Sequence, residues 1–282
     1  MGGPALMLAG IGLYALLDTN TKWLSAGYGL AQVVGARCVS GLLAVLLLAL
    51  LLPRLAGPLG TGRPGLHLLR SAAAVGASVS YYFAFSRLSL AEGYLMFFTA
   101  PFLGLAMSAL ALREKVPAAV WGWCAVGFGG VALAVAPQLA AGGDWRAYLA
   151  ALLGSLCHAT VMTVNRRLRG EHGLARLLLW PCLLGTVLLL PFALGEWQAP
   201  QGADWGLLAM SGLLWGGASV SIALAFRQAP ASRLAPLEFS ALVWSLALDL
   251  LFWGVLPRPA LLLGAAVVVV ACLMSQRVAP AH

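Results

Sequence analysis

The stretch LAQVVGARCVSGLLAVLLLALLL, residues 30–52, decides the fold class, because Arg37 is its only charged residue. A bilayer core is spanned by a helix of about 20 mainly apolar residues, so this run can cross a membrane. The pattern recurs on both sides of it: 61% of the 282 residues are hydrophobic and 9% are charged. A soluble domain carries about 25% charged residues. The composition therefore predicts a polytopic membrane protein and argues against a soluble enzyme, a nucleic-acid binder or a disordered regulator.

Polar residues, prolines and glycines divide the chain into successive apolar runs. We predict an all-α membrane protein with ten transmembrane helices at residues 4–22, 30–52, 67–87, 91–112, 117–137, 145–166, 173–194, 205–227, 233–255 and 259–277. The joints near 88–91, 228–232 and 256–258 are so short that the helices they link must form tight antiparallel hairpins.

The 17 basic residues indicate the orientation of these helices. With a cytoplasmic N-terminus, the inner loops and helix ends carry Arg54, Arg63, Arg70, Arg113, Lys115, Arg166, Arg167, Arg169, Arg176, Arg227, Arg233 and Arg277. The outer side keeps only Lys22, Arg87, Arg146 and Arg258. By the positive-inside rule, both termini are expected in the cytoplasm of a bacterium, with the protein in the inner membrane. The basic residues form no single patch, so the net charge of +8 indicates no nucleic-acid partner.

The chain divides near Gly142 into two sets of five helices, residues 1–141 and 144–282. In each half a proline, Pro117 or Pro257, opens the fifth helix. Because five is odd, the second half must cross the membrane with the opposite polarity. Inverted repeats are typical of secondary transporters, whose substrate sites lie near the midplane where the repeats meet. We therefore expect one integrated transmembrane domain that works by alternating access.

Several short motifs together point to a known family. The first helix ends in DTNTK (18–22), Arg37 lies early in the second, and the fourth begins AEGYLMFFTAP (91–101) and ends LRE (112–114). On these residues the chain resembles the EamA-type branch of the drug/metabolite transporter superfamily, and within it bacterial aromatic amino-acid exporters. The resemblance implies a cavity between helices 1, 3, 4, 6, 8 and 9, with helices 5 and 10 packing the repeats together.

Aromatic residues are concentrated in the third and fourth helices, where few charges accompany them. Such walls favour a flat, apolar ligand, although a packing core explains the same pattern. His158, in the middle of the sixth helix, is expected to line the cavity or to bridge two helices. The candidate substrate-binding residues are Tyr14, Ser78, Tyr82, Tyr94, Phe98, His158, Met162, Trp215, Ser219, Glu238 and Trp244.

Charged residues inside membrane spans are costly and are usually paired or functional. Asp18 and Lys22 stand one turn apart on one face and are expected to form an interfacial ion pair or, with Arg37, an outer gate. Glu238 follows Pro236, which can open the helix and free carbonyl groups toward a cavity. Pro101 suggests a similar break in the fourth helix, and Asp249 is a weaker copy of Glu238.

No enzyme signature, cofactor motif or metal-ligand spacing occurs in the sequence. The expected partners are a small-molecule substrate and the lipid bilayer, and a monomer is compatible with the chain. We predict export of a small, largely apolar metabolite, such as an aromatic amino acid. Two alternatives stay open: proton-coupled export of lipophilic cations through Glu238 or Asp18, and a membrane scaffold or sensor without flux.

Overall fold

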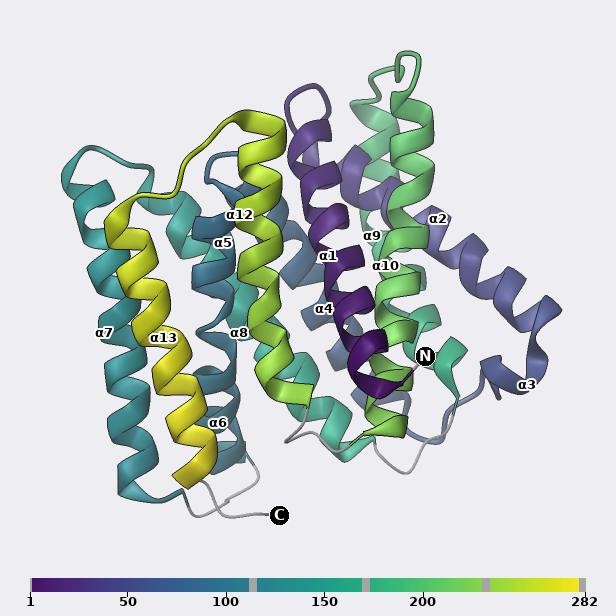
Figure 1. Cartoon of the computed structure of the whole chain (residues 1–282). Helices are drawn as coiled ribbons and strands as arrows, with labels where there is room; N and C mark the ends of the chain where they lie inside the picture. Colours follow the sequence, from purple (N-terminus) through teal and green to yellow (C-terminus); the bar gives the residue numbers. More distant parts are fainter. Residues whose placement is uncertain (1, 112–115, 169–172, 230–233, 279–282) are drawn as a thin grey trace.

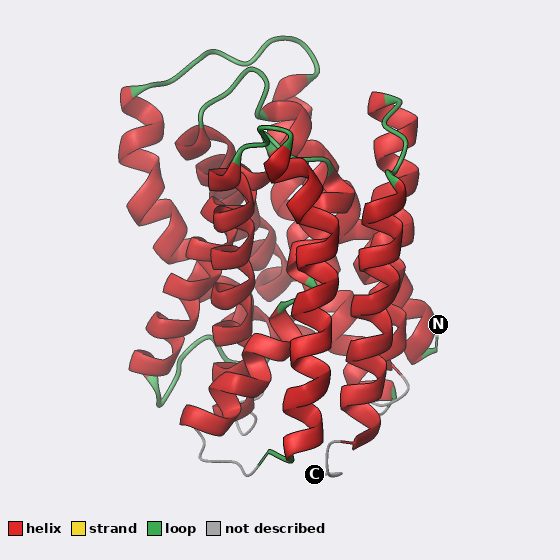
Figure 2. Ribbon diagram, turned by 90° about the vertical axis from the view of Figure 1, so that its left-hand side faces the viewer, coloured by secondary structure: helices red, strands yellow, loops and turns green. Residues whose placement is uncertain are grey.

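The computed structural model describes residues 2–111, 116–168, 173–229 and 234–278, and this part of the chain contains helices but no strand (Figure 1, Figure 2). The elements are α1 (Gly3–Leu24), α2 (Leu30–Leu51), α3 (Pro53–Ala56), α4 (Pro64–Phe85), α5 (Leu90–Phe97), α6 (Ala100–Ala111), α7 (Ala118–Ala140), α8 (Trp145–Arg167), α9 (Leu174–Gly195), α10 (Asp204–Gln228), the 3-10 helix η1 (Ala235–Phe239), α12 (Ser240–Trp253) and α13 (Pro259–Val278). Four basic residues counted above and the acid of the LRE motif lie outside the described residues: Arg113, Lys115, Arg169, Arg233 and Glu114.

Within the described residues, seven stretches are long and apolar enough to cross a membrane. They are Leu30–Leu51, Leu90–Met107, Ala118–Ala140, Trp145–Arg167, Ala175–Gly195, Asp204–Gln228 and Pro236–Trp253. The predicted multi-pass membrane protein is confirmed, whereas ten spans remain a prediction. Three of the ten predicted spans are not among the seven. α1 carries Asp18 and Lys22, α4 carries Arg70, and the apolar part of α13, Pro259–Ser275, is shorter.

Helices that are distant in the sequence pack side by side. α1 lies against α10, α2 against α9, α4 against α8, and α7 against α13. The α7–α13 pair stands at one edge of the bundle, and α2 leans outward at the opposite edge (Figure 1). Small residues permit these close approaches: a Cβ added to Gly264 of α13 would lie 2.5 Å from the carbonyl oxygen of Gly130 of α7. Gly130 and Gly264 thus form a close-packing contact between α7 and α13.

Large apolar side chains cover much of the outer surface of the bundle. On α2, Leu43, Leu50 and Leu51 are more than half exposed, and so are Phe192 of α9 and Leu251 of α12. A water-soluble protein rarely exposes a continuous apolar surface of this kind. The outward-facing side chains are those that lipid would cover.

Two of the helices are interrupted near prolines. The α-helical conformation is lost at Phe98 and Thr99, between α5 and α6 and just before Pro101. Residues 235–239, around Pro236, form the 3-10 helix η1 rather than a continuation of α12. At the start of α5, Ser89 and Glu92 form a capping box, as expected for a carboxylate in a first helical turn.

Candidate functional site

Two tyrosine–serine hydrogen bonds cross the interior of the bundle. The Tyr14 and Ser219 hydroxyls, from α1 and α10, lie 2.8 Å apart. The Tyr81 and Ser155 hydroxyls, from α4 and α8, lie 3.1 Å apart, and Ser155 also donates to the carbonyl oxygen of Met96 at 2.9 Å. Each bond joins a helix of residues 1–141 to a helix of residues 144–282. The sequence predicted Tyr14 and Ser219 as site residues but missed Tyr81 and Ser155.

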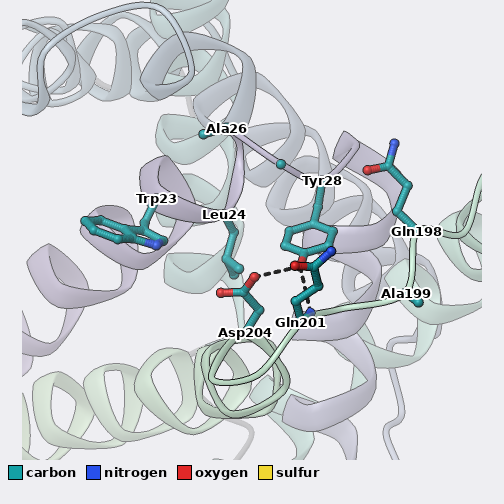
Figure 3. A pocket seen from close by; sticks show the side chains of 9 residues that line it. Trp23, Leu24, Ala26, Tyr28, Gln198, Ala199, Gln201 and Asp204 are labelled. Atoms are coloured by element: carbon teal, nitrogen blue, oxygen red, sulfur yellow. Dashed lines mark hydrogen bonds between the residues drawn. The ribbon is translucent and has the colours of Figure 1, made fainter.

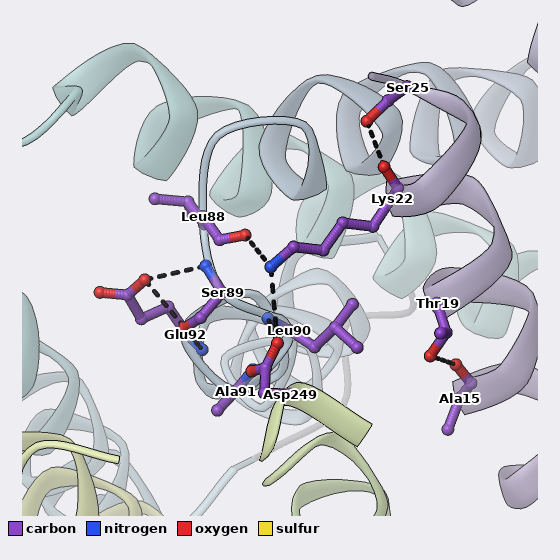
Figure 4. Close-up of polar contacts among 10 residues, drawn as sticks. All are labelled: Ala15, Thr19, Lys22, Ser25, Leu88, Ser89, Leu90, Ala91, Glu92 and Asp249. Atoms are coloured by element: carbon purple, nitrogen blue, oxygen red, sulfur yellow. Dashed lines mark hydrogen bonds and ion pairs between the residues drawn. The ribbon is translucent and has the colours of Figure 1, made fainter. Parts of the chain in front are cut away.

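Asp18 of α1 accepts a hydrogen bond of 2.6 Å from the Tyr94 hydroxyl of α5. The expected ion pair between Asp18 and Lys22 is not formed. Lys22 instead donates to the Leu88 carbonyl oxygen at 2.9 Å and lies 3.4 Å from the Asp249 carboxylate. Asp18 and Lys22 are four positions, or about one helical turn, apart in α1. The Lys22 side chain nevertheless extends to the joint between α4 and α5 (Figure 4). Sequence spacing placed both residues on one face and did not reveal these partners on other helices.

Asp249 is the centre of a buried polar cluster at the same end of the bundle. Its side chain is only 2% exposed, and its two oxygens accept the backbone N–H groups of Leu90 at 3.1 Å and Ala91 at 2.9 Å. The carboxylate therefore satisfies donors of the first turn of α5 while it neutralises Lys22. The Lys22 ammonium also lies 4.6 Å from the centre of the Trp253 ring. From the sequence, Asp249 is a weaker candidate than Glu238. Lys22 and Asp249 are nevertheless both predicted near the outer ends of their helices, where they could meet.

Aromatic rings pack against one another between α4, α5 and α8. Tyr81 stacks on Phe85 with ring centres 5.8 Å apart, and Phe97 lies 6.1 Å from Tyr81 and 6.2 Å from Tyr94. The His158 ring of α8 is 4.8 Å from Phe97, so His158 contacts the aromatic cluster. Among the described residues, no group of three or more His, Cys, Asp or Glu side chains could hold a metal ion.

Three predicted site residues do not lie in this interior. Phe98 is 2% exposed and packs against Phe97 and Phe239 in the core. Tyr82 donates to the Tyr28 carbonyl oxygen at 2.5 Å, in a separate apolar cluster of α2 and neighbouring residues. Met162 is 46% exposed, so it lies at the bundle surface although it stands one turn from His158.

The remaining candidates are distributed around the bundle. Arg37, Ser78 and Trp215 line a small cavity between α2, α4, α9 and α10. Trp244 lies beside α1 near Gly12 and is 42% exposed. Glu238 is partly buried in η1, and Pro101 and Pro236 are exposed.

A larger pocket of about 470 Å³ opens between the loop after α1 and the loop before α10 (Figure 3). The Tyr28 hydroxyl donates to the Asp204 carboxylate at 2.6 Å and accepts the Gln201 N–H at 3.2 Å. The hydrogen bond to Asp204 raises the pKa of Tyr28, because ionisation of the phenol would break that bond. The sequence gives no sign of this pocket, since Tyr28 and Gln198, which both line it, are 170 positions apart.

Comparisons with known proteins agree with this architecture. Residues 145–276 match the EamA-like transporter family. The pseudopaline exporter CntI of Pseudomonas aeruginosa is 25% identical over 94% of this chain and 92% of its own length. Riboflavin transporters of Rhizobium johnstonii and Vibrio cholerae are each 27% identical, over 98% and 95% of this chain and 91% and 90% of their own. A protein of known crystal structure, 17% identical and with a TM-score of 0.66, covers 98% of both chains and shares the fold.

Proposed function

Because this chain carries an EamA-like transporter domain over residues 145–276 and belongs to the EamA-type drug/metabolite transporter superfamily, we propose that it exports small, largely apolar metabolites across the bacterial inner membrane by alternating access. It is a membrane transporter, as its relatives are. The observation that carries the proposal is a polar and aromatic interior, in which two tyrosine–serine hydrogen bonds join the two halves of an otherwise apolar bundle.

The pairing of the helices supports two inverted five-helix repeats, residues 1–141 and 144–282. Exchanging the halves places α1 on α8, α4 on α10, α2 on α9 and α7 on α13. Under this exchange the α1–α10 contact becomes the α8–α4 contact, while the α2–α9 and α7–α13 contacts map onto themselves; all four contacts are present. A two-fold relation between repeats requires this correspondence.

The two tyrosine–serine bonds fit the same exchange. Ser155 stands 141 positions after Tyr14, and Ser219 stands 138 positions after Tyr81. Both offsets are close to the 140 positions between Pro117 and Pro257. The α1–α10 bond and the α8–α4 bond therefore occupy corresponding places, with tyrosine and serine exchanged. We place the substrate site between these two bonds, bordered by Tyr94 and His158.

The Lys22–Asp249 cluster is proposed as the outer gate. It joins α1, the α4–α5 joint and α12 at the end of the bundle that holds the 470 Å³ pocket. With the N-terminus in the cytoplasm, α1 ends at the outer surface, so this end faces outward.

The aromatic interior suits a flat substrate, and the names of the relatives add riboflavin to the compounds worth testing. Purified protein in proteoliposomes, with no other component, should move labelled riboflavin, tryptophan or phenylalanine faster than empty vesicles do. A matched pair of variants gives the control: Tyr14→Phe alters the interior, whereas Met162→Leu alters an exposed side chain. Failure of every compound to cross above the background of empty vesicles would contradict the proposal.

Proton-coupled export of lipophilic cations is a second candidate, favoured by one observation. The Asp18 carboxylate lies in the interior, bonded to Tyr94 and without an ion-pair partner among the residues that the structure describes. Such an acid can exchange a proton for a cationic substrate. An inward-directed proton gradient would then accelerate efflux of a cationic dye from vesicles, and Asp18→Asn would abolish that acceleration.

A further inference from the structure

We propose that Arg37 binds the carboxylate of a small organic acid in the cavity between α2, α4, α9 and α10, so that the transported substrate carries a carboxylate beside its apolar part. This inference rests on the proposed transport function and names the chemical class of its substrate.

Arg37 is buried without a full set of hydrogen-bond partners among the described residues. Arg37 is only 7% exposed, and its Nη2 atom has no hydrogen-bond partner among the described residues. Arg70 of α4 is equally buried, at 7% exposure, but its guanidinium donates to the Asn165 side-chain oxygen at 2.7 Å and the Leu177 carbonyl oxygen at 2.8 Å. A buried, unsatisfied charge is costly. Arg37 thus differs from Arg70 in having a free donor.

Arg37 is also one of the residues that line a cavity. Arg37, Ser78 and Trp215 contribute to its wall together with Cys38, Ala74, Val75, Pro181 and Cys182. Its free volume of about 20 Å³ holds one group of the size of a water molecule, which a carboxylate oxygen can occupy. The guanidinium fork matches a carboxylate, the Ser78 hydroxyl is a second donor, and Trp215 offers an aromatic face to an apolar substituent.

The surroundings favour an anion from the substrate over one from the protein or the lipid. The nearby acid, Asp18, attracts Arg37 through space but is bonded to Tyr94 and forms no ion pair with Arg37 among the described contacts. Arg37 is the eighth residue of α2, about 10 Å from the helix end at 1.5 Å per residue. A phospholipid headgroup at the membrane surface therefore lies away from this depth.

Thermal unfolding of the purified full-length protein in detergent tests the inference with acetate, benzoate, indole-3-acetate and phenylalanine, and with indole-3-acetamide as the neutral control. At saturation, at least one acid should raise the Tm by about 2–4 °C, and the amide should not. Arg37→Met should abolish the shift, and Arg37→Lys should weaken it, because lysine keeps the charge without the fork. Without ligand, Arg37→Met should unfold at the same or a higher temperature than wild type, whereas Arg70→Met should unfold at a lower one.

Three results would overturn the inference: no Tm shift with any acid, an equal shift in wild type and Arg37→Met, or a response to phosphatidylglycerol alone. A fall in the Tm of ligand-free Arg37→Met as large as that of Arg70→Met would also overturn it, since Arg37 would then be structural.

Vesicle flux separates failure of this inference from failure of the proposed function. Transport of acid and amide at equal rates rejects only the role of Arg37, whereas absence of all flux rejects transport itself.

Discussion

Lys22 of α1 and Asp249 of α12 form a buried ion pair, with Nζ 3.4 Å from Oδ1, where α4 turns into α5 (Figure 4). The same carboxylate accepts the N–H groups of Leu90 and Ala91. One side chain thus holds α1, α5 and α12 together. Opening this end of the bundle would have to separate these elements, so the pair is both a stabilising contact and the proposed outer gate.

Asp249→Asn should destabilise the closed form strongly. It leaves Lys22, whose side chain is 15% exposed, without its ion-pair partner, and breaking a buried pair on one side costs about 3–5 kcal/mol. Thermal unfolding in detergent should show a Tm lower by about 6–20 °C. The double variant Lys22→Met with Asp249→Leu should recover part of that loss, because it removes both charges.

An exposed ion pair, between Arg87 and Asp144, serves as the control for Asp249→Asn. Arg87 and Asp144 lie 3.0 Å apart, with side chains 44% and 37% exposed. Asp144→Asn keeps a side chain able to cap α8 and removes a surface pair worth about 0–1 kcal/mol. Equal Tm losses for Asp144→Asn and Asp249→Asn would show that the buried pair has no special role.

Tyr14→Phe and Tyr81→Phe should have similar effects, because their two bonds between the halves correspond under the proposed exchange of the repeats. Each change removes one interior hydrogen bond, worth about 0.5–1.5 kcal/mol, and each should slow substrate flux in vesicles several-fold. Tyr82→Phe is the matched control: it loses a bond to the Tyr28 carbonyl oxygen, outside the interior, and should unfold more easily while it transports normally. A flux loss confined to Tyr82→Phe would contradict the placement of the site.

Gly264→Ala should weaken the contact between α7 and α13. The added Cβ would meet the Gly130 carbonyl oxygen at 2.5 Å and the Ala134 Cβ at 2.6 Å, so the helices must separate, at a cost of about 1–3 kcal/mol. Gly122→Ala, in α7 with nothing within 4 Å of the added Cβ, should leave the Tm unchanged or slightly higher. A Tm for Gly264→Ala at or above that of wild type would refute close packing here.

Glu238→Gln tests whether Glu238, rather than Asp18, carries the proton in the cation-export candidate. Glutamine keeps the size and hydrogen-bonding capacity of the side chain but cannot release a proton. Facilitated export predicts that downhill flux from vesicles persists in Glu238→Gln and that it shows the same dependence on a pH gradient as in wild type. Loss of gradient-driven flux, with downhill flux retained, would instead favour the proton-coupled cation exporter.

Most of the fold could be predicted from the sequence because bilayer thickness restricts the length and polarity of each helix. Helix bounds such as 30–52 and 145–166 differ from α2 and α8 by a single residue at one end. The break before Pro101 and the 3-10 turn at Pro236 lie where prolines remove backbone donors. The small α3 was not predicted, since four residues between two apolar runs give no periodic signal.

The contacts of the site were less predictable, because they depend on which helices become neighbours. Helical spacing grouped Tyr94 with Phe98, whereas in the structure the Tyr94 hydroxyl bonds to Asp18 and the Phe98 ring packs against Phe239. It paired Lys22 with Asp18, four residues away, whereas the actual partner, Asp249, is 227 positions distant. The type of each residue was enough to single out the polar positions. Which of them contact one another could be seen only in the packed structure.

Counterflow across proteoliposomes tests the central claim most directly, because it requires a solute to cross by a carrier that alternates between two sides. Vesicles that contain this protein alone are loaded with unlabelled substrate and diluted into a trace of the labelled compound, with riboflavin, tryptophan and indole-3-acetate as the substrates. Transient accumulation of label above its outside concentration, absent from empty vesicles, is the result we predict. Equilibration without accumulation would indicate a channel, and no uptake of any compound would contradict transport by this protein.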